Sequence, residues 1–185
     1  QIDEADGGAG VPGTVGETSL EAAVAAILLE ARDGIIDNAV GSPDNILTLT
    51  QNITLRVTNS NGTPDASGIT LDEYAITTTG SVTMQADTAG GAGVVNVTIG
   101  QPITSAGISI DTNDGSITTS GALNSGAGTI VVTASTNVVI SAAMTSTSVA
   151  GITITATNGS ITDTGLFALT TPLISLNAGT NIGAV

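Results

Sequence analysis

The chain has 185 residues, enough for one sizeable core, but one Phe, one Tyr and no Trp, so small β-branched residues must fill its interior. Its 16 acidic residues and two arginines give a net charge of −14. This charge excludes nucleic acid and anionic membrane surfaces as partners, because phosphate binding needs clustered Lys and Arg. Cysteine is absent, which excludes disulfides and thiolate metal sites but does not identify a compartment.

The N-terminal stretch differs from the rest of the chain. It is acidic and Gly-rich, so residues 1–17 are expected to form a flexible or docking arm, followed by a single domain over 18–185. Nothing resembles a signal peptide, so the chain is expected to begin inside a longer precursor or after a cleavage. Strong helix formers follow Thr18, a candidate cap, so 18–25 is predicted to be either a strand or a short helix covering the first coil.

Near copies of one phrase recur along the chain. "ISIDTNDGSI" begins at Ile108 and "ITITATNGSI" at Ile152, and related phrases begin at Ile130 and Ile174, so these four starts are 22 residues apart. Earlier copies begin at positions 27, 53 and 82, at intervals of 26, 29 and 26 residues. The repeat predicts seven coils, of which the earlier ones carry insertions such as "NSNGTPDASG" and "DTAGGAG".

Each coil begins with alternating apolar residues, which places them on one face of a strand over 27–31 and at each later start. The fourth residue after the start is small in most coils, as at Ala134 and Ala156, where an inward corner has room for little more than a methyl group. The expected core ladder, with near-zero exposure in its Ile110 column, comprises Ile108, Ile110, Ile130, Val132, Ile152, Ile154, Ile174 and Leu176.

Corners and two further strands complete each coil. Pairs such as Asp114-Gly115 and Asn158-Gly159 tolerate the left-handed backbone that a sharp bend requires. A second strand is predicted to be led by Ile36, Ile117, Val139, Ile161 and Ile182. A third strand is predicted in "ILTLT" at 46–50, "VVNVTI" at 94–99 and "LFALT" at 166–170.

Three strands and three corners per coil describe an all-β fold. The prediction is a right-handed parallel β-helix, or β-solenoid, of about seven three-strand coils, with an extended N-terminal arm or a short capping segment. Seven coils at about 4.8 Å would be roughly 34 Å tall. A sandwich of antiparallel strands is the alternative, although it has no reason to preserve a 22-residue spacing.

The phrases "ILLEARDGII", "ITITATNGSI" and "LISLNAGTNIGAV" resemble the repeats of filamentous-haemagglutinin-like exoproteins and other giant bacterial surface adhesins over residues 27–185. The resemblance implies a secreted, rod-forming, non-enzymatic protein at the cell surface, used for attachment or as a structural fibre. The secretion domain of that family carries Asn-Pro motifs, and this chain has no Asn-Pro dipeptide. The chain would therefore be part of a shaft, or a relative exported by another route.

Catalysis and metal binding find little support. Without His, Cys or Lys, catalysis would need carboxylates that meet on one face, yet Asp72 and Glu73 are consecutive and Asp111 is expected to stack near Gln85 and Thr133. No enzyme activity and no cofactor are therefore expected. "DTNDG" and "RDGIID" superficially resemble acidic calcium loops, but their spacing matches no known pattern, so corner turns are favoured and calcium remains the alternative.

Two functions follow from this reading. The first is an extracellular, self-associating subunit or shaft of a cell-surface fibre, sheath or adhesin. The second is an adhesive module whose insertion loops bind a carbohydrate or protein on a host or matrix surface. The loops are small and polar and do not concentrate the aromatic or charged groups that a binding site would need, which favours the first.

The chain ends suggest how copies would assemble. The seventh coil lacks a third strand, and "TSLEAAV" lies where a third strand of a preceding coil would belong. Residues 1–25 of one copy are therefore expected to complete the last coil of the next by strand addition, which would build a head-to-tail filament. The residues expected at this assembly interface are Leu20, Val24, Ile174, Leu176, Ile182 and Val185.

Overall fold

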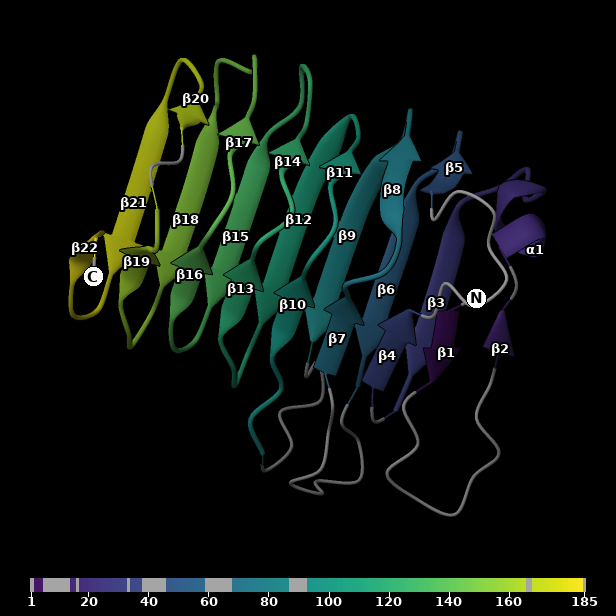
Figure 1. The fold of residues 1–185 in the computed structure, drawn as a ribbon, viewed down its shortest axis with the longest axis horizontal. Helices are drawn as coiled ribbons and strands as arrows, with labels where there is room; N and C mark the ends of the chain where they lie inside the picture. The colour runs from purple at the N-terminus through teal and green to yellow at the C-terminus, as the bar shows by residue number, and fades with distance from the viewer. Residues whose placement is uncertain are drawn as a thin grey trace.

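The computed structural model describes residues 2–4, 14–15, 17–32, 34–37, 46–58, 68–86, 93–165 and 168–184. Apart from one short helix, α1 (Glu17–Glu21), these residues form strands in three sheets that wind into a parallel β-solenoid (Figure 1). The described strands make six coils of three strands and a seventh of two, which confirms the predicted class. The antiparallel sandwich is excluded, because successive coils pair in parallel.

Sheet B contains the strand that begins each coil. All of its pairings are parallel and in register, so that Ile108 pairs with Ile130, and Ile130 pairs with Ile152. Its outward side chains form flat rows on one long side of the solenoid. Its strands are β3 (Ile27–Ala31), β6 (Ile53–Val57), β9 (Ser81–Ala86), β12 (Gly107–Thr112), β15 (Ile130–Ala134), β18 (Ile152–Ala156) and β21 (Ile174–Ala178).

Sheet A contains the second strand of each coil: β4 (Gly34–Asp37), β7 (Gly68–Leu71), β10 (Val97–Ile99), β13 (Ile117–Thr119), β16 (Val138–Ile140), β19 (Ile161–Asp163) and β22 (Ile182–Ala184). Two more strands extend this sheet at its N-terminal edge. β1 (Ile2–Glu4) pairs antiparallel with β4, and β2 (Thr14–Val15) pairs antiparallel with β1. The described parts of the N-terminal segment therefore lie against the chain's own first coil.

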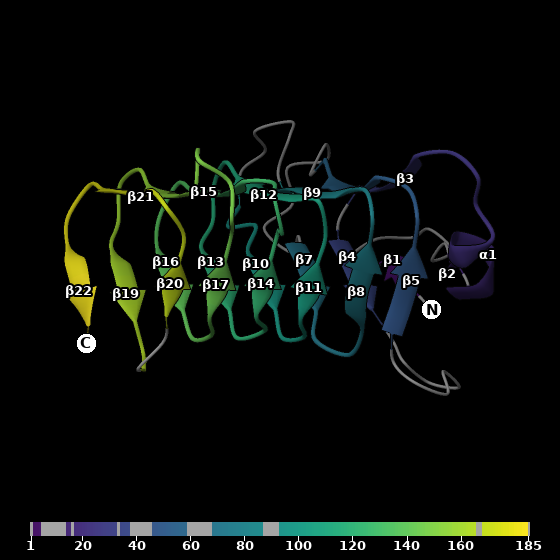
Figure 2. The same cartoon turned by 90° about the horizontal axis from the view of Figure 1, so that it is seen from above.

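Sheet C contains the third strands: β5 (Ile46–Leu49), β8 (Ala75–Thr78), β11 (Ile103–Thr104), β14 (Leu123–Asn124), β17 (Met144–Thr145) and β20 (Leu169–Thr170). In Figure 2 these strands follow one another along the length of the solenoid. Helix α1 lies beside β5 at the N-terminal end, and its Glu21 carboxylate accepts a hydrogen bond from the Thr48 N–H at 2.8 Å. The segment 18–25 thus starts as a helix, although α1 begins at Glu17, so Thr18 lies inside the helix and is not its cap.

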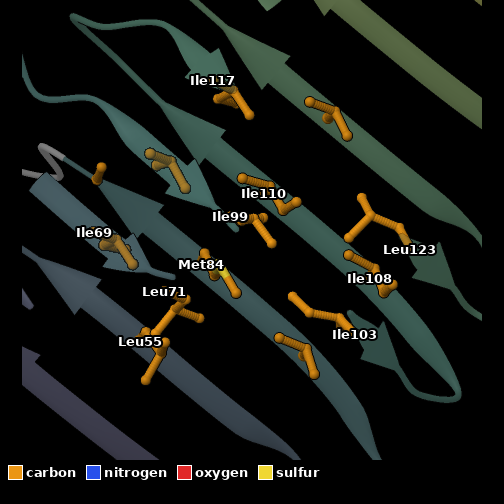
Figure 3. Packing of buried hydrophobic residues seen from close by; sticks show 14 of the residues in the cluster. Leu55, Ile69, Leu71, Met84, Ile99, Ile103, Ile108, Ile110, Ile117 and Leu123 are labelled. Carbon is orange, nitrogen blue, oxygen red and sulfur yellow. The ribbon is translucent and has the colours of Figure 1, made fainter. Parts of the chain in front are cut away.

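The core lies between the three sheets and consists of inward columns of Ile, Val and Leu (Figure 3). Met84 and Ile110 of sheet B face Ile99 of sheet A and Ile103 of sheet C. Fully burying such a side chain contributes about 1.5–3 kcal/mol, so repetition of the columns replaces the large aromatic residues that the chain lacks. Small residues occupy the inward corner as expected, and Ala86, Ala134 and Ala156 are at most 1% exposed.

Two predictions about the second strand were wrong by one residue. Val138, not Val139, pairs with Ile117, and Ile35, not Ile36, pairs with Ile69. Three residues separate the inward residue that ends sheet B's strand from the first inward residue of β4 or β16, whereas four separate the same positions before β13. The side chains of Ile36 and Val139 therefore point outward. A period-two strand reverses its faces when the register shifts by one residue.

The assignment of 94–99 to a third strand was also wrong. Within this stretch β10 spans Val97–Ile99 and pairs with β7 and β13, so it is the second strand of its coil. The third strand of that coil is β11. The insertion at 87–93 falls before β10 and places the second strand of this coil later in the sequence than in the 22-residue coils.

The glycines at the corners serve close packing. Neither Gly115 nor Gly159 has the predicted left-handed backbone. A Cβ atom at Gly115 would lie 2.0 Å from the Val95 carbonyl oxygen, and one at Gly159 would lie 2.4 Å from the Thr136 carbonyl oxygen. Glycine is required there because the backbone of the preceding coil passes where a side chain would begin.

Candidate functional site

The most enclosed acidic side chain in the described residues is Asp37, at the end of β4. Its side chain is 2% exposed and accepts three backbone hydrogen bonds from the corner between β7 and β8. The N–H groups of Asp72 and Glu73 donate at 3.0 Å, and that of Tyr74 donates at 2.6 Å. Burial raises the pKa of Asp37 above its ordinary value, although the three hydrogen bonds favour the carboxylate.

This arrangement gives Asp37 a structural role. Both carboxylate oxygens are occupied by backbone donors, so Asp37 fastens the first coil to the second rather than presenting an oxygen to a ligand. The sequence analysis did not single out Asp37. The repeat could have identified Asp37, because it occupies the inward position that Leu71, Ile99 and Ile140 occupy in later coils. A carboxylate at a buried position needs hydrogen-bond partners.

In sheet B, the charged side chains lie on the outer surface. Arg56 donates to Glu30 at 2.6 Å, in an exposed ion pair between neighbouring strands. Asp111 lies between Gln85 and Thr133, as the repeat predicted, and partial burial raises its pKa above the ordinary value. Within the described ranges, no three acidic side chains meet in a way that could hold a metal ion.

The core ladder is buried in the middle of the solenoid and exposed at its C-terminal end. Ile108, Ile110, Ile130, Val132, Ile152 and Ile154 are at most 2% exposed. In the last described coil, Ile174 is 44% exposed and Leu176 is half-buried, because the described residues include no further coil that covers them. The expected near-zero exposure was therefore wrong for Leu176.

The residues predicted for the assembly interface differ in their exposure and in their place in the solenoid. Leu20 is 4% exposed and packs in the chain's own core, whereas Val24 is 95% exposed. At the other end Ile174, Leu176 and Ile182 surround the open end of the core, and Val185 lies outside the described residues. The structure thus brings the three C-terminal residues together and places Leu20 at the opposite end (Figure 1).

A cavity of about 190 Å³ opens at this C-terminal end. Most of its lining is apolar, but the inward side chain of Asp163 stands among the isoleucines and leucines and accepts a hydrogen bond from the Gly165 N–H at 2.8 Å. The lining residues are Ile140, Ile161, Asp163, Leu169, Leu176, Ile182 and Gly183. The cavity is the exposed end of the hydrophobic core.

The two insertion loops, at positions 59–67 and 87–92, lie outside the described residues.

Among the residues that are described, no helix is long and apolar enough to cross a membrane. The chain matches no protein-family model, no curated protein and no solved structure. Its function must therefore be argued from the solenoid itself.

Proposed function

We propose that the chain is a structural segment of an extracellular fibre, sheath or adhesin at a cell surface, and that it has no catalytic activity. The observation that carries this proposal is the in-register stack of sheet B, whose seven strands pair in parallel without interruption. Such a stack is a rod that adds length with each coil. The mostly polar side chains on the outward face of sheet B and the chain's high negative charge suit a solvated shaft.

Copies of the chain are proposed to join head to tail. The edges of β20, β21 and β22 present backbone groups and apolar columns at the C-terminal end, where Ile174 and Ile182 are exposed. Strand edges of this kind invite pairing with another chain. Residues 1–25 of a second copy are the proposed donor. To join the neighbour's open end, β1 would release its pairing with β4, and Leu20 would leave its own core.

Electron microscopy of the purified chain tests this proposal. We expect filaments of solenoid width from the full chain and separate short rods from a variant that lacks residues 1–25. Val149→Ala provides a control outside residues 1–25 and outside the last coil, because this side chain is 88% exposed. Filaments that are unchanged by the deletion would rule out strand addition by the N-terminal segment. Rods alone from the full chain would contradict self-assembly itself.

A further inference from the structure

The long side of the solenoid formed by sheet C differs chemically from the side formed by sheet B. The strands of sheet C present an outward column, in which the coils pair residue for residue. Five of its six members are threonines: Thr48, Thr77, Thr104, Asn124, Thr145 and Thr170. These side chains are exposed or half-exposed. Among the described residues, the five threonine hydroxyls form no hydrogen bond within the chain.

A second outward column runs beside the first and is apolar and small. In the first two coils this column consists of Ile46 and Ala75, which pair with each other. In each of the next four coils, the member of the column is the residue immediately before β11, β14, β17 or β20. These positions hold Pro102, Ala122, Ala143 and Ala168. We call the two columns together the sheet C face. Its rows of methyl and hydroxyl groups are flat because no long side chain rises from either column.

The sheet C face carries no charge in a chain whose net charge is −14. The strands of sheet C contain no acidic or basic residue, whereas the outward face of sheet B carries Glu30, Arg56 and Asp111. Two copies of so acidic a chain repel each other wherever charged surfaces meet. This repulsion is therefore weaker across the sheet C face than across the outward face of sheet B.

The chemistry of the face is also complementary to itself. A threonine hydroxyl both donates and accepts hydrogen bonds, so one column of threonines can pair with a second, identical column. Alanine methyl groups allow two sheets to approach without a clash, and sheets normally pack about 10 Å apart. A surface with donors alone, or with one sign of charge, would fit a different partner.

We propose that the sheet C face is the surface through which two copies of the chain associate side by side, related by a twofold axis. Six strands at about 4.8 Å make the face roughly 29 Å long, so it covers on the order of 400 Å² per copy. Stable pairs bury about 800 Å² per partner. A single pair is therefore weak, and it strengthens when many copies lie along one rod, because each further contact becomes intramolecular.

Cysteine cross-linking detects such a weak contact, and the chain has no native cysteine to interfere. Thr104 lies in β11, next to the middle of the six-strand sheet, where a twofold axis brings equivalent residues together. Under mild oxidation, Thr104→Cys should form covalent dimers on the order of 100-fold faster than Thr118→Cys, an outward position of sheet A, because association raises the effective thiol concentration by about two orders of magnitude above its bulk value. Equal rates for the two variants would overturn the proposal.

A charge variant gives a second, independent measurement. Asn124→Asp adds a carboxylate of the same shape to the face and keeps the Oδ1 atom that accepts a hydrogen bond from Gly126 N–H at 3.0 Å. Asn137→Asp is the matched control, since Asn137 Oδ1 accepts a hydrogen bond from Ser160 N–H at 2.9 Å at a different corner.

In the Thr104→Cys background, Asn124→Asp should slow dimer formation about tenfold in dilute salt and lose this effect in 1 M salt, where the Debye length is about 3 Å. Asn137→Asp should leave the rate unchanged. If both variants slow the reaction equally, or neither does, the sheet C face is not the interface. The cross-link forms whether or not rods join end to end, so this result is separate from the test of filament formation.

Discussion

The two ends of the solenoid have the same repeat and opposite environments. Ile27 and Ile174 occupy the same column in the first and last coils, but their side chains are 9% and 44% exposed. The N-terminal end is covered by α1, whose Leu20 lies in the core, and by β1, which pairs with β4. Among the described residues, none covers the C-terminal end in this way. A repeat therefore specifies which side chains point inward, and the neighbouring layer decides whether they are buried.

The largest effect is expected from a charge placed inside the middle of the stack. Ile154→Asp should unfold the chain, because burying an unpaired carboxylate costs several kcal/mol and a whole domain is stable by about 5–15 kcal/mol. Leu176→Asp, in the same column at the open end, should lower stability much less, since Leu176 is half-buried. Thermal unfolding compares the two variants. Similar losses at both positions would remove the distinction between covered and open coils.

The next effect concerns the cover at the N-terminal end. Leu20→Ala should destabilise the chain by about 2–5 kcal/mol, the usual cost of removing a buried leucine side chain. Val24→Ala should have no measurable effect, because Val24 is 95% exposed. Urea unfolding of both variants measures the difference. A neutral Leu20→Ala would show that α1 does not cover the core in solution.

A smaller loss is expected where the first coil is fastened to the second. Asp37→Asn replaces a carboxylate oxygen with an NH₂ group that faces backbone donors, so at least one of the N–H groups of Asp72, Glu73 and Tyr74 loses its acceptor. Leaving a buried donor unpaired costs about 1–3 kcal/mol. Hydrogen exchange should show faster exchange at Tyr74 N–H than in the middle coils. Unaltered protection of this amide would contradict the role given to Asp37.

The sequence predicted the regular coils well because each strand there meets nearly identical neighbours. The pairing of Ile108 with Ile130 and of Ile130 with Ile152 follows from the spacing alone. The number of residues in each corner is not fixed by the repeat, and the shorter corners before β4 and β16 led to the inward assignment of Ile36 and Val139. Contacts made only once, such as that of Asp37 with the corner at 72–74, leave no trace in a periodic pattern. The sheet C face was also missed, because its strands are only two to four residues long.

The smallest expected effect concerns pH and again separates the middle of the solenoid from its ends. Partial burial raises the pKa of Asp111 above the ordinary value, so the folded chain binds this proton more tightly than the unfolded chain. By linkage, the contribution of Asp111 to stability is fully present below the unfolded pKa and is lost as pH rises through the folded pKa. Stability should therefore increase as the pH is lowered from 7 towards about 4, close to the ordinary aspartate pKa.

Repulsion among the chain's many acids would act in the same direction, so the two causes must be separated. Salt at 1 M shortens the Debye length to about 3 Å and suppresses repulsion between exposed charges, but it leaves the burial of Asp111 unchanged. In 1 M salt, Asp111→Asn should raise the melting temperature slightly at pH 7 and reduce its increase on acidification. Thr133→Asn, the next position in the same outward column, is the control and should retain the full increase. A melting temperature that falls between pH 7 and pH 4.5 would show that protonation of the partly buried Asp111 does not favour the folded chain.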